Sequence, residues 1–499
     1  MKILVAPDSY KGTMSQTEAG IAMKRALLQV NPNLDIVVKP MADGGEGTLD
    51  VLASHSKDVQ EVTLPVPGPL GKKIMSKFII IKGKTAVIEV AEVLGLPLIQ
   101  GSLDDVGNRT SYGLGEIIIK ALDLGIRKFL IGLGGSATND GGFGMLQALG
   151  VKFLGQEGNR LSEYSKDLYK VDRVQLTRLD PRIKESDFTI MSDVANPLYG
   201  ERGSTAIFGP QKGIKNCDIV NIDKSMEKYA HIVLKKFSPH RNLATKKGAG
   251  AAGGLGFALS LLGGQIVDGA SFIAKHLNLE ESIKESHFVF TGEGKSDATT
   301  ISGKAPAYVA KLAKKYNIPC ILVSGRIEKK QLLMNYFTKV YSLVDDKTRV
   351  EIAMDHPEQT LVNKMKKIVK ETIIMKKQIH TEKAPAAIGP YSQAIEAGDF
   401  VYVSGQLGLN PETRELEEGI EAQTKQMMEN AKIILAEAGL SLADAVKCTI
   451  YLSSMDHFSI VNEIYASYME EPYPARVAIE VSRLPNDGLV EMDVIAYKK

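Results

Sequence analysis

The chain has 499 residues, and at about 150 residues per domain this length predicts roughly three domains, each able to form its own core. Lysine and arginine (61 residues) nearly balance aspartate and glutamate (59 residues), so the net charge of +2 gives no indication of a nucleic-acid partner. The three cysteines are far apart and odd in number, and the N-terminal apolar run is too short for a signal peptide. We therefore expect a cytoplasmic protein without a membrane partner.

The first part of the chain alternates predicted strands with predicted helices. An apolar strand is expected over Lys2–Ala6, and Ser15 with Glu18 three residues later forms a capping box for a helix that runs to about Val30. Further strands are predicted at Leu34–Val38, Phe129–Leu133, Phe188–Ser192, Phe288–Thr291 and Cys320–Ser324. This alternation favours an α/β fold with mostly parallel sheets, in which ligands bind beyond the carboxyl ends of the strands.

The predicted elements divide the chain into two parts. Residues 1–376 are expected to form two lobes: a Rossmann- or flavodoxin-like lobe from about 1–63 and 266–376, and a second α/β lobe from about 64–265. A helix is predicted over Thr360–Met375. Residues 378–499 are expected to form a separate α+β unit with predicted elements at Phe400–Val403, Ile420–Ala438, Val446–Leu452, His457–Met469, Arg476–Val481 and Leu489–Tyr497.

Four glycine-rich segments are candidates for phosphate binding, because glycine lets the backbone approach phosphate closely: residues 132–142, 209–213, 248–256 and 292–297. Gly294-Lys295-Ser296 imitates the end of a P-loop, but Val289 stands where that motif requires glycine, so a P-loop is excluded. Gly132-x-Gly134-x-x-Ala137, with Glu157 about 20 residues on, leaves a dinucleotide-dependent dehydrogenase as an alternative. The polar residues that continue this loop suit hydroxyl and phosphate contacts better than a dinucleotide site.

Seven phrases of the first part, in order, resemble glycerate kinase of the first bacterial type over about 370 residues. They begin at Pro7, Ala42, Gly134, Ser192, Phe208, Gly248 and Thr291. The resemblance implies ATP- and Mg²⁺-dependent phosphorylation of D-glycerate to a phosphoglycerate, and it leaves open which hydroxyl group receives the phosphate.

Several residues of these phrases are candidates for phosphoryl transfer, which needs carboxylates for magnesium, cations and backbone amides for phosphate, and a group that orients the hydroxyl. We expect catalytic roles for Asp8, Lys11, Asp43 and Asp193, metal binding by Asp193 or Asp297, and substrate binding by Lys212. The expected nucleotide-binding residues are Gly134, Gly135, Ser136, Thr138, Asn139, Asp140, Gly250, Gly253 and Gly254. For any single aspartate, a role as a helix cap or turn residue is an equal alternative.

Four phrases of the second part, in order, resemble the Rid (YjgF-type) family of enamine/imine deaminases: residues 384–391, 403–406, 474–476 and 484–491. The resemblance implies a fold like that of chorismate mutase and hydrolysis of reactive 2-enamine or 2-imine acids, such as 2-aminoacrylate, to 2-keto acids and ammonia without a cofactor. It also implies a homotrimer, formed through this part, with pockets shared between neighbouring subunits.

Arginine suits the substrate carboxylate because its planar guanidinium binds carboxylate through two hydrogen bonds. Arg476 matches the family's carboxylate-binding arginine, and Glu491 matches the glutamate that positions the water. Tyr391, Ser404, Gly405 and Asn462 match the remaining pocket positions. Many relatives have a cysteine two residues after the arginine, where this chain has Ala478, so a mechanism that uses a thiol at this position is excluded.

Two readings of the whole chain follow from these resemblances. In the first, the chain is a bifunctional enzyme with a kinase site and a deaminase site. In the second, the C-terminal part is a non-catalytic trimerisation or ligand-sensing module attached to a glycerate kinase.

Overall fold

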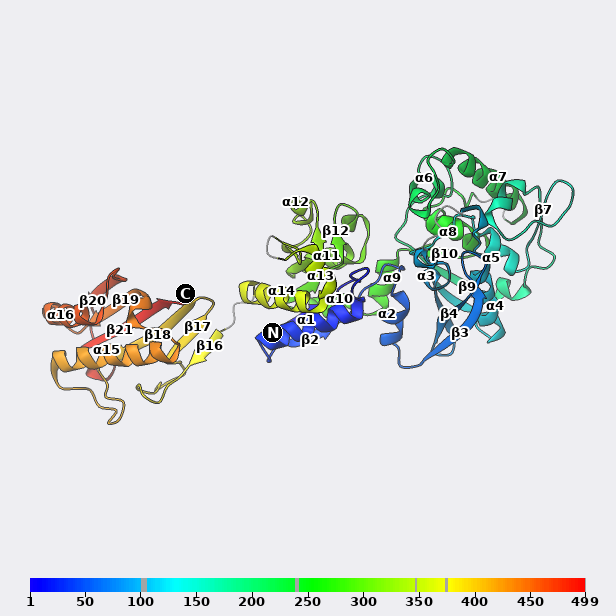
Figure 1. Cartoon of the computed structure of the whole chain (residues 1–499). Coiled ribbons are helices and arrows are strands. Elements are labelled where there is room, and N and C mark those ends of the chain that lie inside the picture. The colour runs from blue at the N-terminus through cyan, green and yellow to red at the C-terminus, as the bar shows by residue number, and fades with distance from the viewer. Residues whose placement is uncertain (100–105, 238–241, 346–347, 373–375, 499) are drawn as a thin grey trace. The chain divides into compact units, whose positions relative to one another are not determined.

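The computed structural model describes residues 1–99, 106–237, 242–345, 348–372 and 376–498, and it divides into two compact units, Met1–Lys366 and Lys367–Lys499 (Figure 1). The division falls inside helix α14 (Pro357–Thr372), ahead of the boundary near residue 376 expected from the sequence. Each unit has apolar core residues of its own. Among the described residues, no helix combines the length and the apolar character that crossing a membrane requires.

The first lobe of the first unit contains a five-stranded sheet in the order β15-β13-β11-β1-β2, and every pair in it is parallel. Its strands are β1 (Lys2–Val5), β2 (Asp35–Val38), β11 (Phe288–Thr291), β13 (Cys320–Ser324) and β15 (Lys339–Ser342). In chain order this arrangement is the flavodoxin-like 2-1-3-4-5 pattern, whose strand order reverses between β1 and β11. The predicted α/β fold is thereby confirmed.

Helix α1 (Gln16–Val30) begins at the predicted capping box. The Glu18 backbone N–H donates to Ser15 Oγ, and the Ser15 N–H donates to the Glu18 carboxylate, which satisfies two amides at the start of the helix. The other helices of this lobe are α2 (Thr48–Ser54), α9 (Gly269–His276), α10 (Leu279–Lys284), α11 (Ala305–Lys315), α12 (Lys330–Leu333), α13 (Val350–Asp355) and α14.

The second lobe contains a six-stranded sheet in the order β10-β9-β6-β5-β4-β3, in which β10, β9, β6 and β5 are parallel and β4 and β3 form an antiparallel extension. The strands are β3 (Val59–Pro67), β4 (Lys73–Ile81), β5 (Thr85–Glu89), β6 (Lys128–Gly132), β9 (Asp187–Met191) and β10 (Gln265–Val267). A two-stranded sheet of β7 (Lys152–Leu154) and β8 (Arg173–Gln175) accompanies it. Its helices are α3 (Val90–Leu94), α4 (Tyr112–Asp123), α5 (Phe143–Ala148), α6 (Ser204–Phe208), α7 (Ile219–Phe237) and α8 (Ala251–Leu261).

Helices α2 and α9 lie between the two lobes (Figure 1). The turn that precedes α2, residues 43–47, rests on the second lobe: the Gly134 N–H donates to Gly44 O at 3.2 Å, and a Cβ at Gly134 would lie 2.3 Å from Gly45 Cα. Buried Glu89, the last residue of β5, accepts hydrogen bonds from the Gly47 and Leu49 N–H groups. The turn that carries Asp43 is therefore held by the second lobe, although it follows a strand of the first.

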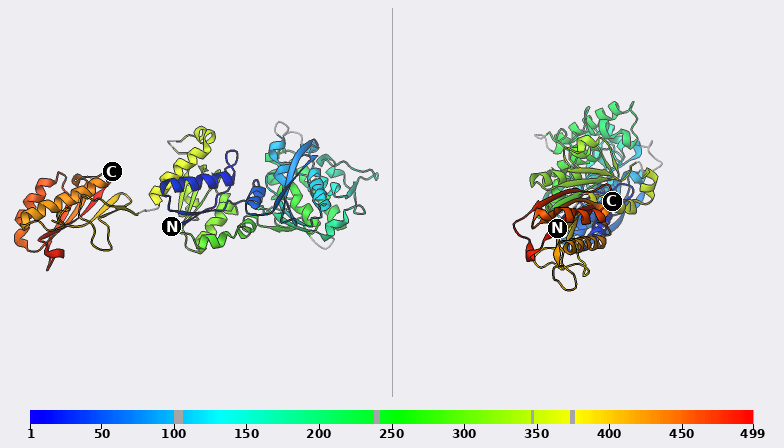
Figure 2. Two further views of the ribbon diagram at one scale, coloured as in Figure 1. Left: turned by 90° about the horizontal axis from the view of Figure 1, so that it is seen from below. Right: turned by 90° about the vertical axis from the view of Figure 1, so that its left-hand side faces the viewer.

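The second unit is a six-stranded mixed sheet in the order β16-β17-β18-β21-β19-β20, with helices on one face (Figure 2). Its elements are β16 (Lys376–Ile379), β17 (Ala394–Ala397), β18 (Phe400–Leu407), α15 (Gly419–Glu437), β19 (Ala445–Leu452), α16 (Phe458–Tyr468), β20 (Ala475–Glu480) and β21 (Val490–Tyr497). Only β19 and β20 are parallel among its pairs. Alternate residues of β21 are buried in the core, starting at Val490, so Glu491 and Asp493 lie on the opposite face.

Candidate active sites

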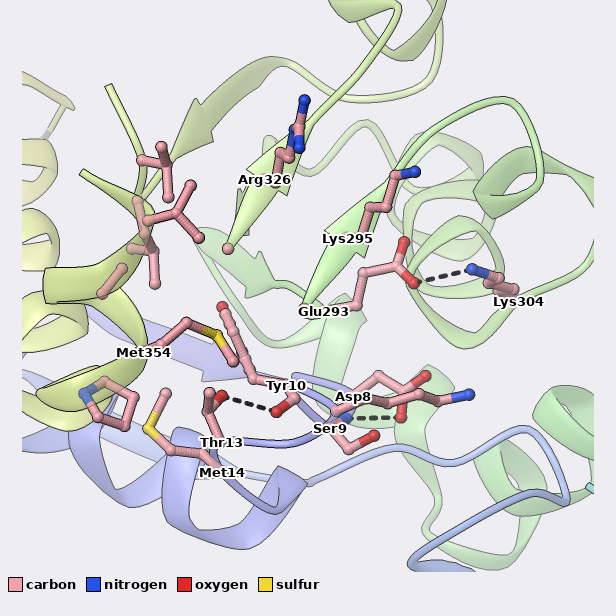
Figure 3. A pocket seen from close by; sticks show the side chains of 18 of the residues that line it. Asp8, Ser9, Tyr10, Thr13, Met14, Glu293, Lys295, Lys304, Arg326 and Met354 are labelled. Atoms are coloured by element: carbon pink, nitrogen blue, oxygen red, sulfur yellow. Dashed lines mark hydrogen bonds and ion pairs between the residues drawn. The ribbon is translucent and has the colours of Figure 1, made fainter. Parts of the chain in front are cut away.

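The first candidate site is a cavity of about 270 Å³ at the carboxyl edge of the first sheet (Figure 3). Three loops meet there, those that follow β1, β11 and β13. The Asp8 N–H donates to Gly292 O at 2.8 Å, the Gly294 N–H to Ser9 O at 3.2 Å, and the Arg326 N–H to Gly294 O at 3.0 Å. The loops approach so closely because glycines stand at the contacts, and a Cβ at Gly292 would lie 1.9 Å from Val323 O.

This cavity, called cavity 1 below, has two kinds of wall. One wall is apolar and is formed by Met14, Leu343, Val344, Val350, Ala353, Met354 and Pro357. The other is charged and is formed by Asp8, Lys11, Asp43, Glu293, Lys295, Lys304 and Arg326. In Figure 3 the two methionines lie on one side, and the Glu293–Lys304 ion pair lies on the other.

Glu293 is buried in the charged wall, and both of its carboxylate oxygens have partners. Oε1 accepts from Ser296 Oγ at 2.8 Å and from Thr300 Oγ1 at 2.6 Å, while Oε2 accepts from Lys304 Nζ at 3.3 Å. These contacts hold the Lys304 ammonium group at the cavity. Our sequence analysis singled out the phrase that contains Glu293 but assigned no role to Glu293 or Lys304.

A second cavity, cavity 2, has a volume of about 190 Å³ and lies at the carboxyl edge of the second sheet. Gly134, Gly135 and Ser136 line it after β6, and Ser192 and Asp193 line it after β9. Lys11 and Asp43 line both cavities, so the two cavities meet at these side chains.

Lys212 lies at the wall of cavity 2 and is almost completely buried. Its Nζ donates to Ser136 Oγ at 3.0 Å and to Thr138 O at 2.7 Å, and burial lowers its pKa to about 7. Fully buried Arg109 donates from Nη1 to Ala137 O and to Lys212 O, which ties the Ser136 loop to the Lys212 turn. Arg109 was missed by the sequence analysis because no glycine-rich phrase contains it.

Three aspartates surround the junction of the cavities. Burial, and then the nearby Asp43 carboxylate, raise the pKa of Asp8 well above its usual value. The same two causes raise the pKa of Asp193 to about 6, although the side chain remains open to solvent at the mouth of the cleft. Carboxylates that repel one another in this way attract a cation to the space between them.

Other predicted residues line neither cavity. Asp140 is buried and accepts hydrogen bonds from Ser111 and from the amides of Gly142 and Gly144, while Asn139 bonds to Thr205 and Ser204. The buried Thr138 contributes its carbonyl to Lys212. These three residues are buried within the glycine-rich loop, of which Leu133, Gly134, Gly135 and Ser136 reach cavity 2.

The glycines of the 248–256 segment and Asp297 have structural roles. The glycines allow backbone segments to pack closely, and Asp297 stabilises a turn. A Cβ at Gly253 would lie 2.0 Å from Thr138 O, one at Gly250 would lie 2.2 Å from Pro197 O, and one at Gly254 would lie 2.6 Å from Gly141 Cα. Asp297 accepts from the N–H and the Oγ1 hydroxyl of Thr299, which lowers its pKa, and it lines neither cavity. Its geometry is that of a turn residue.

In the second unit, Arg476 on β20 lies against helix α16. Its Nη2 donates to Asn462 Oδ1 at 2.8 Å, and its guanidinium lies 4.7 Å from the centre of the Tyr465 ring. Arg476 pairs across the sheet with Cys448, which is buried beneath the helices. Arg476 and Asn462 therefore belong to the helix-covered side of the sheet.

Glu491 lies on the other side of the same sheet. It pairs with Tyr451, three residues after Cys448, and an odd offset along a strand reverses the face. A Cβ at Gly405 would lie 1.8 Å from Glu491 Oε1, so a side chain at this position would displace the carboxylate. Burial, and then Asp493, raise the pKa of Glu491. Arg476 and Glu491 of one chain therefore lie on opposite faces of the sheet.

The other two predicted residues are Ser404, which precedes Gly405, and Tyr391, in the segment that leads to β17. Ser404 Oγ donates to Ser392 O at 2.7 Å, and the half-exposed Tyr391 accepts at its hydroxyl from the Ile388 N–H. The predicted pocket residues thus form two groups, Arg476 with Asn462 and Glu491 with the segments around Gly405.

Two α/β lobes that meet at carboxylates, lysines and glycine-rich loops are typical of a phosphotransferase. Residues 3–373 match the family model described as the glycerate kinase family, and residues 381–498 match the model described as Endoribonuclease L-PSP. The chain therefore belongs to the glycerate kinase family, which agrees with a kinase rather than a dehydrogenase, and its C-terminal unit is a Rid-type domain.

Individual proteins show the same division. Glycerate 2-kinase of Escherichia coli is 41% identical over 66% of this chain and 86% of its own. A solved structure assigned as glycerate kinase 2 of Salmonella typhimurium has a TM-score of 0.64 and 34% identity, and the match covers 74% of this chain and 98% of that one. RidA of an Antarctic Psychrobacter is 50% identical over 24% of this chain and 98% of its own, with a TM-score of 0.24.

Because Lys212 is held with a lowered pKa, its replacement should change how stability depends on pH. Between the folded pKa of about 7 and the ordinary value of 10.5, the unfolded chain carries a proton that the folded chain lacks, so the free energy of unfolding rises with pH in that window. Lys212→Met should remove this rise and stabilise the protein most below pH 7. Urea denaturation at pH 6, 8 and 10 measures the free energy of unfolding, and Lys224→Met, at an exposed lysine, serves as control. An equal slope in Lys212→Met and wild type would contradict the buried-lysine account.

Proposed function

We propose that the first unit transfers the γ-phosphoryl group of ATP to the 2-hydroxyl group of D-glycerate at the junction of cavities 1 and 2. The observation that carries the proposal is that Lys11 and Asp43 line both cavities, so two ligands would meet there. The choice of hydroxyl follows the name of the E. coli relative, glycerate 2-kinase.

In the proposed reaction the hydroxyl oxygen forms a bond to the γ-phosphorus, and the bond from that phosphorus to the bridging oxygen of the β-phosphate breaks. ADP leaves with the electron pair, and the hydroxyl proton passes to the Asp193 carboxylate. A pKa of about 6 leaves Asp193 ionised at neutral pH and still able to accept a proton. Lys11 lies where the two cavities meet, and its positive charge would stabilise the negative charge of the phosphoryl group during its transfer.

The residues at the junction fit a magnesium ion. No group of three or more acidic, histidine or cysteine side chains among the described residues forms a complete cage. Mg²⁺ does not need one, because it usually binds through one or two carboxylates and completes its shell with water and phosphate oxygens. Asp8 and Asp43 are close enough for one carboxylate to raise the pKa of the other, so they suit this role. When bound, the ion neutralises phosphate charge.

Asp193→Asn should lower kcat by about 10²- to 10⁴-fold, the usual contribution of a general base, with the fold intact. In the wild type, kcat/KM for glycerate should fall as pH falls through about 6, because protonation removes the base. A coupled ADP-release assay from pH 5 to 8 measures both effects. Asp187→Asn changes an exposed carboxylate at the amino end of the same strand and serves as control. Near-normal turnover of Asp193→Asn would exclude Asp193 as the base.

For the second unit, we propose hydrolysis of 2-imine and 2-enamine acids. Arg476, oriented by Asn462 and by the Tyr465 ring, would bind the substrate carboxylate. Glu491 would deprotonate the water that adds to the imine carbon, and a raised pKa makes it a better proton acceptor. Glu491 passes this proton to the imine nitrogen, so that a carbinolamine forms. The hydroxyl proton of the carbinolamine then moves to the nitrogen while the carbon–oxygen double bond forms and the carbon–nitrogen bond breaks, which releases ammonia and leaves a 2-keto acid.

The two groups of site residues lie on opposite faces of one sheet, and this supports a site shared between subunits. The face that carries Glu491 also exposes a set of large apolar side chains: Phe400, Tyr402, Val477, Ile479 and Tyr497. Exposed apolar patches of this kind mark interaction surfaces. We propose that neighbouring copies cover this face in a homotrimer and place the Arg476 of one subunit near the Glu491 of the next.

A shared site makes a quantitative prediction for mixed subunits. Arg476→Ala and Glu491→Gln homotrimers should each lack 2-aminoacrylate hydrolysis. Co-refolding equal amounts of both should restore about one quarter of wild-type activity, because about a quarter of the interfaces receive an intact arginine and an intact glutamate. Glycerate phosphorylation by each variant serves as the internal control. An inactive mixture in which hybrid trimers are demonstrated by mass spectrometry would contradict the shared site, and a wild type without hydrolysis would favour the non-catalytic module.

A further inference from the structure

Most of the apolar wall of cavity 1 is formed by a segment that lies outside the seven phrases that resemble glycerate kinase. Leu343 and Val344 follow β15, Val350 and Met354 belong to α13, and Pro357 begins α14. Met354 is 53% exposed and Val350 is 46% exposed, although both side chains line the cavity. Large apolar groups exposed at the mouth of a concave site provide binding surface for an apolar part of a ligand.

The wall has the composition that a flat aromatic group requires. Met14 and Met354 project toward the cavity from different elements (Figure 3). Methionine is flexible and polarizable, and its sulfur makes favourable contacts with aromatic rings. The hydroxyl of Tyr10, which also lines the cavity, donates to Val323 O and is therefore not exposed as a polar group.

The opposite wall has the charges that an anion requires. Lys304 is directed to the cavity by Glu293, and it stands at the N-cap of α11, where the helix dipole favours negative charge. Lys11 forms no ion pair among the described residues. Lys295 and Arg326 stand at the rim, where both contact Glu328.

The position of cavity 1 in the fold agrees with these two walls. It lies at the carboxyl ends of β1 and β11, between which the strand order of the sheet reverses. In open α/β sheets this is the usual place for a nucleotide. Cavity 2 is smaller, and polar residues such as Ser136, Ser192, Asp193 and Lys212 line it together with Glu46 and the apolar Leu96 and Phe208.

We propose that cavity 1 binds the nucleoside triphosphate and that cavity 2 binds glycerate. The base would lie on the apolar wall formed by Met14, Leu343, Val344, Val350, Ala353, Met354 and Pro357, and the phosphates would extend past Lys304 to Lys11. The inference rests on the proposed kinase function and deepens it. In this proposal glycerate is bound by three residues that we expected from the sequence to bind the nucleotide: Gly134, Gly135 and Ser136. Glu293 is then a positioning residue, because it holds Lys304 beside the phosphates.

Helix α13 offers a matched pair of substitutions. Val350 and Met354 line cavity 1, whereas Ile352, which is 49% exposed on the same helix, does not. Met354→Asp should raise KM for ATP at least tenfold and change KM for D-glycerate less than twofold, because it places a negative charge against the base and near the phosphates. Ile352→Asp should leave both constants within twofold of the wild type. The reverse pattern, with KM for glycerate raised and KM for ATP unchanged, would overturn the assignment.

Photolabelling of the intact wild-type chain tests the same assignment without a variant. With 2-azido-ATP, peptide mapping should find the label at Leu343 or Val344, within residues 350–357, or at Met14, and excess ATP should prevent labelling. Label on residues 134–140 would overturn the inference even if the enzyme phosphorylates glycerate. A wild type that does not phosphorylate glycerate in the presence of ATP would instead contradict the proposed kinase function.

Discussion

The kinase site depends on the attachment of one turn, residues 43–47, to a lobe other than the one from which it emerges. Glycine-to-glycine packing against Gly134 and two amide hydrogen bonds to Glu89 fix this turn on the second sheet. Asp43 thereby lies near Asp8 and Lys11, which stand in the loop after β1, and both cavities open onto Lys11 and Asp43. Any side chain at Gly134 would separate these surfaces, because its Cβ would overlap the Gly45 backbone.

The two units bring the residues of a polar site together in different ways. In the kinase unit, the carboxyl edges of the parallel strands in two sheets of one chain supply the acids, cations and glycines. In the Rid-type unit, sheet alternation sends Arg476 and Glu491 to opposite faces, so completing the proposed site requires a second copy. The same alternation that buries Val490 and Met492 in the core places Glu491 on the opposite face. The separation of the two groups is therefore a consequence of the fold.

Much of the fold and of the kinase site could be predicted from the sequence, because strand ends, glycine-rich segments and helix caps are local signals. The strands at Phe288–Thr291 and Cys320–Ser324 and the Ser15 capping box are confirmed residue by residue. Other features depend on tertiary contacts. The exposed side chains of α13 form a cavity wall only together with the loops that follow β1 and β11, and Arg109 finds its carbonyl partners only in the folded loops. Likewise, Asp140 and Asn139 suit phosphate by composition, but folding gives them protein partners.

The most direct test of the central claim is a crystal structure of the intact chain with D-glycerate and a non-hydrolysable ATP analogue. The account predicts that the γ-phosphorus lies beside Lys11 and Asp43, about 3.5 Å from a glycerate hydroxyl oxygen that contacts Asp193. A complex in which the two ligands occupy places that do not meet at Lys11 and Asp43 would contradict it.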